Sequence, residues 1–156
     1  TPILIGLHQK KKFSFNKEFK KILKIMIFLS ILISFFIFVF SKSIIGILYG
    51  SEFYESIDVL KINIWSLIFV SMGVISSQWY IIKNKQHFSL YYVLLGAIAN
   101  IILNYFLIPL YGANGAAIST LISYSMIILI FDLLAKETRE IFYLKISVFL
   151  PLKMTK

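Results

Sequence analysis

The sequence contains no cysteine and, between His87 and Asp132, no ionisable residue other than tyrosine. The first absence excludes disulfides and thiolate metal ligands and leaves the redox compartment open. The second is unusual for a soluble domain, whose surface loops usually carry charge. Hydrophobic residues make up 59% of the chain and the mean hydropathy is +0.86, whereas soluble domains are roughly 45–50% apolar. These values predict an all-α integral membrane protein.

Four apolar stretches have the length of membrane-spanning helices. We expect them at about residues 25–48, 62–82, 88–110 and 113–134, within a membrane region of residues 25–135. Residues 1–24 precede them as a basic juxtamembrane segment. Residues 136–156 form a tail whose short apolar stretch is either an interfacial helix or the start of a further span.

The basic residues are unevenly distributed. Seven lysines lie within residues 1–24, where Phe15, Phe19 and Ile22 share one helical face, a pattern typical of a helix in the headgroup layer. These lysines either only hold the segment in the cytoplasm or bind lipid. Alternate connections of the four spans hold fourteen and two Lys or Arg residues. The positive-inside rule therefore places both ends and the 83–87 loop in the cytoplasm, and the net charge of +9 indicates orientation rather than nucleic-acid binding.

The clearest turn signal lies inside the uncharged stretch. Pro109 falls in the last turn of the third span, Gly112 can end that helix, and Gly115 and Ala116 open the fourth span with small side chains. We expect a tight, uncharged helical hairpin in which these four residues pack.

Neutral polar residues are the candidates for a substrate path. Asn100 and Asn104 share one face of the third span, while Gln78 and Trp79 lie near the end of the second. Such side chains are costly in lipid, so they face either a partner helix or an aqueous cavity; for Trp79, an interfacial anchor is a further reading.

Catalytic motifs are absent from the sequence. There is no Walker A motif, no Gly-x-Ser-x-Gly, no His-Glu-x-x-His and no paired His or Cys ligands. We therefore expect no enzyme, no metal site and no cofactor.

Three motifs in order resemble the C-terminal part of bacterial polysaccharide flippases of the multidrug/oligosaccharidyl-lipid/polysaccharide exporter superfamily. They are Tyr49-Gly50 with Glu52-Phe53, then Asn100 with Leu103-Asn104, then Leu107-Ile108-Pro109, Tyr111-Gly112 and Gly115-Ala116-Ala117. The resemblance covers roughly residues 10–135.

The resemblance implies four helices of a 12–14-helix fold with two lobes around a central cavity. Such proteins flip a lipid-linked oligosaccharide across the bacterial cytoplasmic (inner) membrane by alternating access, in the synthesis of surface polysaccharide such as O-antigen. The expected partners are the lipid bilayer, this substrate and other polysaccharide-assembly membrane proteins. The family's cavity cations lie mainly in helices that this chain lacks, and we expect no membrane-embedded charge here to replace them.

Three alternatives remain open at this point. One is a drug/cation antiporter of the same superfamily, and another is a small four-helix multidrug pump that dimerises. The third is a non-transporting subunit or truncated fragment, which the initial Thr1 and the short final segment would fit.

Overall fold

The computed structural model describes the backbone of residues 2–149 and the side chains from residue 15 onward. The described chain is helical and contains no strand, which confirms the all-α prediction. The elements are α1 (Pro2–Leu48), the 3₁₀ helix η1 (Ser51–Phe53), α2 (Ser56–Asn63), α3 (Ser66–Ile82), α4 (Gln86–Tyr111), α5 (Ala113–Leu134) and α6 (Arg139–Phe149).

Four helical stretches of the described chain are long and apolar enough to cross a membrane: Phe15–Leu48, Ser56–Ile82, Gln86–Tyr111 and Ala113–Leu134. The second begins earlier than the expected residue 62, because it includes α2, which the expected ranges left in a connection between spans. The first lies in a helix that is continuous from Pro2, so no helix end marks its expected start at residue 25. Hydropathy locates the apolar core of a helix better than its ends, because helices continue into the polar interface.

Helix α1 continues without a break from the basic segment into the first span. Its 47 residues correspond to roughly 70 Å at a 1.5 Å rise, more than twice the hydrocarbon thickness of about 30 Å. Phe19, Leu23 and Ile27 are buried along one face, whereas Ile22 is 50% exposed. The stripe that packs against the other helices thus advances by four residues each time, and Ile22 lies outside it.

The second span contains a local break between α2 and α3. Residues 64 and 65 keep helical dihedral angles. The backbone hydrogen bonds there span three residues instead of four, with Leu67 N donating to Ile64 O at 3.1 Å. The Ser34 hydroxyl of α1 donates to this same Ile64 carbonyl at 2.9 Å. A side chain of a neighbouring helix thus bonds the backbone oxygen beside the break, as a membrane-embedded helix requires.

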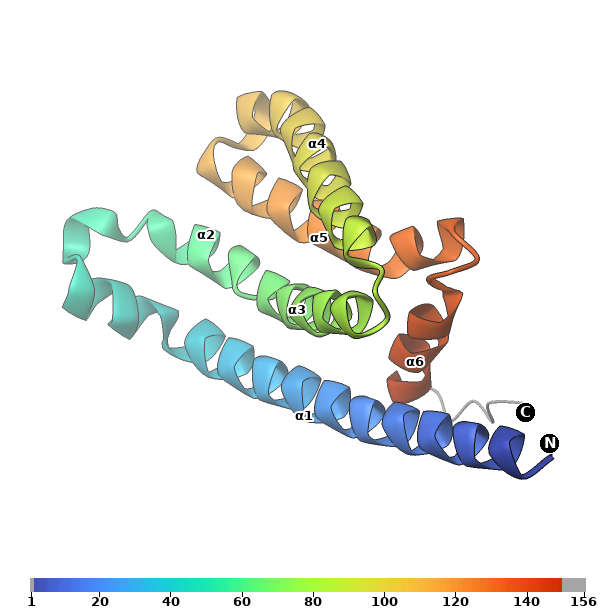
Figure 1. Cartoon of the computed structure of the whole chain (residues 1–156). Coiled ribbons are helices and arrows are strands. Elements are labelled where there is room, and N and C mark those ends of the chain that lie inside the picture. The colour runs from blue at the N-terminus through green and yellow to red at the C-terminus, as the bar shows by residue number, and fades with distance from the viewer. Residues whose placement is uncertain (1, 150–156) are drawn as a thin grey trace.

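The helices run back and forth between two ends of the molecule (Figure 1). The α1–α2 and α4–α5 turns lie at one end. The α3–α4 turn lies at the other, where α6 sits against α1, α3 and α5. The buried core is concentrated at this second end, where Leu23, Tyr80, Ile128 and Leu144 are each fully buried.

Large apolar surfaces remain exposed elsewhere. Helix α4 has no buried residue, and Phe28, Phe35 and Phe36 of α1 are each more than half exposed. A soluble monomer rarely exposes so much apolar surface, which agrees with an integral membrane protein.

Candidate functional site

Helices α4 and α5 meet through a short ladder of neutral polar side chains. The Asn100 amide nitrogen donates to Ser123 Oγ at 3.2 Å and lies 3.4 Å from Thr120 Oγ1. The Asn104 amide donates to Asn100 Oδ1 at 3.0 Å, while Asn104 Oδ1 is buried without a hydrogen-bond partner among the described residues. The two asparagines therefore share a face, and that face is directed at α5.

Small side chains on α5 allow α4 and α5 to pack closely. The buried positions of α5 facing the hairpin are Gly115, Ser119 and Ser123, spaced by four residues. The two serine hydroxyls donate to the preceding turn of α5, Ser119 Oγ to Gly115 O at 2.8 Å and Ser123 Oγ to Ser119 O at 2.6 Å. Each serine thus presents a small, internally satisfied side chain to α4.

The four residues predicted to pack in the hairpin fall into two groups. Gly112 joins the helices with φ +57°, and Gly115 is so close to α4 that an added Cβ would lie 2.1 Å from the Leu107 carbonyl oxygen. Ala116 is only half-buried, and Pro109 is exposed in the last turn of α4. The closest contact is therefore at Gly115, while Gly112 supplies the turn.

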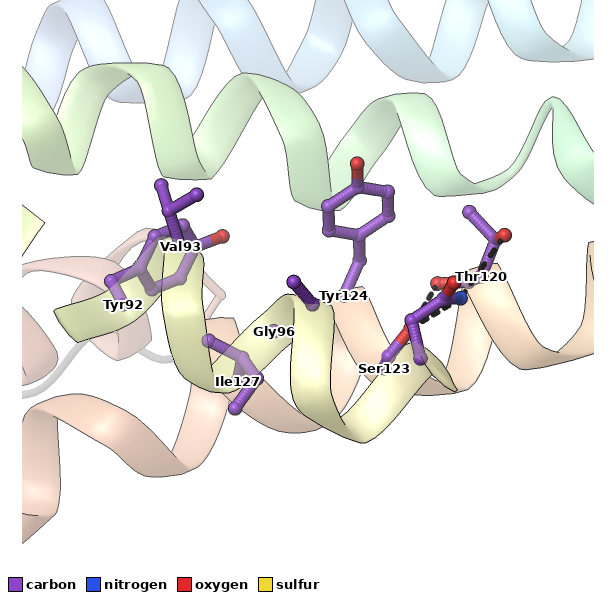
Figure 2. Close-up of a pocket in the computed structure, with 9 residues that line it drawn as sticks. Tyr92, Val93, Gly96, Thr120, Ser123, Tyr124 and Ile127 are labelled. Carbon is purple, nitrogen blue, oxygen red and sulfur yellow. Dashed lines mark hydrogen bonds between the residues drawn. The ribbon is translucent and has the colours of Figure 1, made fainter. Parts of the chain in front are cut away.

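A cavity of about 330 Å³ lies beside the polar ladder (Figure 2). Its polar lining consists of Asn100, Thr120, Ser123, Tyr92 and Tyr124, and apolar atoms of both helices complete it. Figure 2 shows Tyr124 pointing from α5 toward the α2–α3 ribbon. No carboxylate or cation lines this cavity within the described residues, so it suits a ligand portion that hydrogen-bonds without charge.

Gln78 and Trp79 lie elsewhere. Gln78 is exposed, and Trp79 is 1% exposed, with Lys83 and Lys85 Nζ at 5.6 and 6.0 Å from its ring. Its indole N–H has no hydrogen-bond partner among the described residues. Neither side chain lines the α4–α5 cavity, and both belong to α3. The two differ in exposure because neighbours in a helix point about 100° apart.

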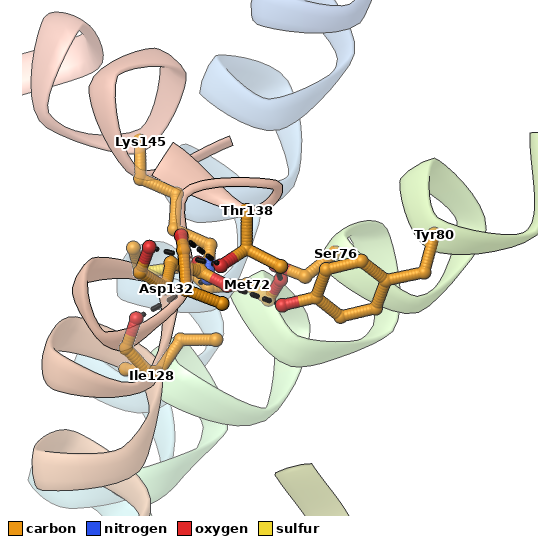
Figure 3. Close-up of polar contacts among 8 residues, drawn as sticks. Met72, Ser76, Tyr80, Ile128, Asp132, Thr138 and Lys145 are labelled. Carbon is orange, nitrogen blue, oxygen red and sulfur yellow. Dashed lines mark hydrogen bonds and ion pairs between the residues drawn. The ribbon is translucent and has the colours of Figure 1, made fainter. Parts of the chain in front are cut away.

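A second polar cluster was missed by the sequence analysis (Figure 3). Asp132 of α5 and Lys145 of α6 are 0% and 2% exposed, with Lys145 Nζ 2.5 Å from Asp132 Oδ2. The sequence analysis did not predict that these two charges pair inside the protein. In the sequence, each residue is a single charge within an apolar segment, IFDLLA for Asp132 and YLKISV for Lys145. This pattern could have indicated that the two charges are buried. It could not indicate that they pair, because only the fold brings the two segments together.

The Asp132 carboxylate is fully partnered. Its other oxygen accepts a hydrogen bond from the Tyr80 hydroxyl of α3, and Lys145 Nζ also donates to Ile128 O at 3.2 Å. Thr138 Oγ1 donates to the Asp132 backbone carbonyl at 3.0 Å. Burial lowers the pKa of the Lys145 ammonium, and the Asp132 carboxylate opposes that shift.

Polar contacts nearer the surface surround this cluster. Glu140 of α6 accepts from the Asn16 amide at 3.0 Å and lies 3.7 Å from Lys83 Nζ, while Lys85 Nζ donates to Glu137 O at 2.9 Å. These contacts tie α1 and the α3–α4 turn to the beginning of α6.

No group of three or more His, Cys, Asp or Glu that could hold a metal occurs in the searched part of the chain. Four helices long and apolar enough to span a membrane, with a neutral polar cavity between α4 and α5, are the features of a portion of a membrane transporter.

Residues 6–155 match the family described as Lipid II flippase MurJ, and the chain belongs to this family. The family is part of the flippase superfamily that the motifs had indicated, and its members are transporters rather than enzymes. No curated protein and no solved structure matches the chain.

Proposed function

We propose that this chain forms part of a flippase that moves a lipid-linked saccharide across the bacterial cytoplasmic membrane by alternating access, without covalent chemistry. The observation that carries the proposal is the neutral polar cavity of α4 and α5 in a member of a lipid-flippase family.

The chemistry of the cavity supports a saccharide. Sugar hydroxyls and amides need donors and acceptors along their path, but no counter-charge. Asn100 supplies both, and Thr120, Ser123 and the two tyrosines supply hydroxyls. Asn104 does not line the cavity itself; it lies one helical turn beyond Asn100 and donates to Asn100 Oδ1 at 3.0 Å. Its own side-chain oxygen is buried without a partner among the described residues, and an unpaired buried acceptor costs free energy that a ligand hydroxyl would recover.

Two lipid-linked saccharides are candidates for the substrate. The family match favours lipid II. The motif order from Tyr49-Gly50 through Gly115-Ala116-Ala117 favours instead the lipid-linked oligosaccharide of a surface polysaccharide such as O-antigen. Both share the chemistry of a lipid carrier bearing sugars, so the cavity fits either.

Complementation separates the two substrates. The full-length parent protein would be expressed in one strain depleted of its lipid II flippase and in another lacking its polysaccharide flippase. Survival of the first strain identifies lipid II, and restored surface polysaccharide in the second identifies the oligosaccharide. Complementation of neither strain contradicts the proposed function.

Substitutions within the rescued strain test the cavity. Asn100→Ala and Asn104→Ala should reduce flipping while protein abundance in the membrane stays normal. Gln78→Ala is the matched control, because it removes an amide from an exposed position away from the cavity and should leave flipping unchanged. Parental activity in the asparagine double variant would remove these residues from the path, and joint loss of abundance and activity would assign them to packing.

Orientation is part of the proposal. The α3–α4 turn, α6 and the basic half of α1 share one end of the molecule. We place this end in the cytoplasm, on the strength of the fourteen-to-two distribution of basic residues.

A further inference from the structure

The buried cluster of Tyr80, Asp132 and Lys145 lies outside the proposed saccharide path. It joins three helices, because its members come from α3, α5 and α6 (Figure 3). Each member is at most 2% exposed. Both carboxylate oxygens of Asp132 have partners, and Lys145 contacts a carboxylate and a backbone carbonyl.

Such a pair is a poor means of increasing bulk stability. Apolar side chains of similar volume often replace a buried ion pair with no loss of stability, whereas removal of one partner leaves an uncompensated charge. The pair therefore contributes mainly by fixing the position of one helix relative to the others. Removal of either partner abolishes this contribution.

Helix α6 is the element whose position depends on this pair. Its described part, Arg139–Phe149, has 11 residues. Ala135 separates it from α5 with extended backbone angles (φ −109°, ψ 137°), and a turn of three residues follows. Ile141 and Leu144 bury its inner face, while Tyr143 is 51% exposed. A short helix after a non-helical joint can move as a unit.

We propose that Asp132 and Lys145 form a latch that holds α6 docked against α1, α3 and α5, and that the latch opens during the transport cycle. Opening would separate the ammonium from the carboxylate and rotate α6 about the joint at Ala135. Tyr80 remains on the carboxylate and limits the cost of the open state, since Asp132 keeps one hydrogen bond. The opening step rests on the proposed function, and the docking step does not.

Docking can be measured with a single cysteine in a cysteine-free parent. Ser147 is 3% exposed, and its hydroxyl bonds only the preceding turn at Leu144 O, so Ser147→Cys is a small change on the inner face of α6. Maleimide labelling of purified protein in detergent should be slow. Adding Asp132→Asn should accelerate it at least tenfold, because the neutral amide no longer holds the ammonium.

Two control cysteines interpret that result. Tyr143→Cys, on the exposed face of α6, should label rapidly in both backgrounds. Ser119→Cys, fully buried on α5, should stay slow in both. Acceleration confined to Ser147→Cys supports release of α6. Equal Ser147→Cys rates with and without Asp132→Asn, or acceleration at Ser119→Cys as well, would overturn the docking role.

The double variant Asp132→Leu with Lys145→Met tests opening. It replaces the charges with apolar side chains that keep α6 packed, so labelling at Ser147→Cys should stay slow while flipping of the precursor moved by the parent falls at least tenfold. Slow labelling with parental flipping would show a static contact and refute the latch. Fast labelling would also refute it, because the apolar pair should keep α6 docked.

The complementation experiment and the labelling experiment can fail independently. If the parent complements neither flippase-deficient strain, the proposed function fails, and the labelling rates still decide whether the ion pair docks α6.

Discussion

The closest backbone approach in the hairpin gives a prediction whose size follows from the structure. A Cβ added at Gly115 would lie 2.1 Å from the Leu107 carbonyl oxygen and 2.5 Å from its carbon. Ordinary C···O contacts are about 3.3–3.6 Å, so α4 and α5 would have to separate by roughly 1 Å. Both obstructing atoms belong to the backbone and cannot rotate away.

The expected cost of Gly115→Ala follows from two opposed effects. Overpacking costs about 1–3 kcal/mol, and the backbone overlap puts this site at the upper end. Alanine favours a helix over glycine by about 0.5–1 kcal/mol. We therefore expect a net loss of about 2 kcal/mol, and a larger loss for Gly115→Leu, which should also lower the folded yield in detergent.

Gly96→Ala is the matched control. It lies in α4, and its added Cβ would meet only Ile127 Cγ1 at 3.9 Å, an ordinary contact. This substitution should be neutral or stabilise by up to about 1 kcal/mol.

Thermal unfolding of the parent protein in detergent, followed by tryptophan fluorescence, measures both substitutions. A loss of about 2 kcal/mol corresponds to a melting temperature lower by roughly 4–8 °C for a chain of this size. Equal melting temperatures for the two alanine variants would refute the close contact, and would indicate that the small face of α5 is directed at lipid.

Three further predictions follow from the turns and the buried cluster. Single cysteines at Asn84 and Ser56 should label oppositely with an impermeant maleimide in intact cells, with Ser56 accessible from outside; the reverse pattern would contradict the orientation. Gly112→Ala should lower the melting temperature although nothing lies within 4 Å of its Cβ position, because φ +57° with ψ −135° suits glycine alone; unchanged melting would show that the turn relaxes. Tyr80→Phe should destabilise by about 1–3 kcal/mol by removing a donor from the buried Asp132 carboxylate, and an unaltered melting curve would contradict that bond.

The apolar pattern predicted most of the fold because each span is a local property of its own residues. The ends of the second, third and fourth spans at residues 82, 110 and 134 agree with the helix ends at Ile82, Tyr111 and Leu134. The break at residues 64 and 65 was not predictable in this way. Ser66 Oγ donates locally to Asn63 O across it at 2.7 Å, but Ser34 of α1, thirty residues away, also bonds the Ile64 carbonyl, and that contact exists only in the fold.

The candidate site was predictable to the same degree. Asn100 and Asn104 share a face by helical spacing alone, and the structure places that face against α5. Helical spacing cannot say which neighbour a side chain meets, so it did not separate buried Trp79 from exposed Gln78. The pairing of Asp132 with Lys145 was hidden for the same reason, because each charge alone is indistinguishable from an interfacial residue.

The α4–α5 cavity and the buried ion pair share helix α5. Ser123 and Ile127 line the α4–α5 cavity, and the next residue, Ile128, supplies the carbonyl that accepts from Lys145. One turn further, Asp132 forms the ion pair. An unbroken helix transmits a rotation along its axis, because each residue is bonded to the fourth before it. A force that α6 applies to Asp132 therefore acts on the helix that forms one wall of the cavity, within two turns of Tyr124. Under the proposed latch, the cavity therefore needs no charge of its own to respond to the buried ion pair, and a neutral lining and a charged cluster can serve the same proposed transport cycle.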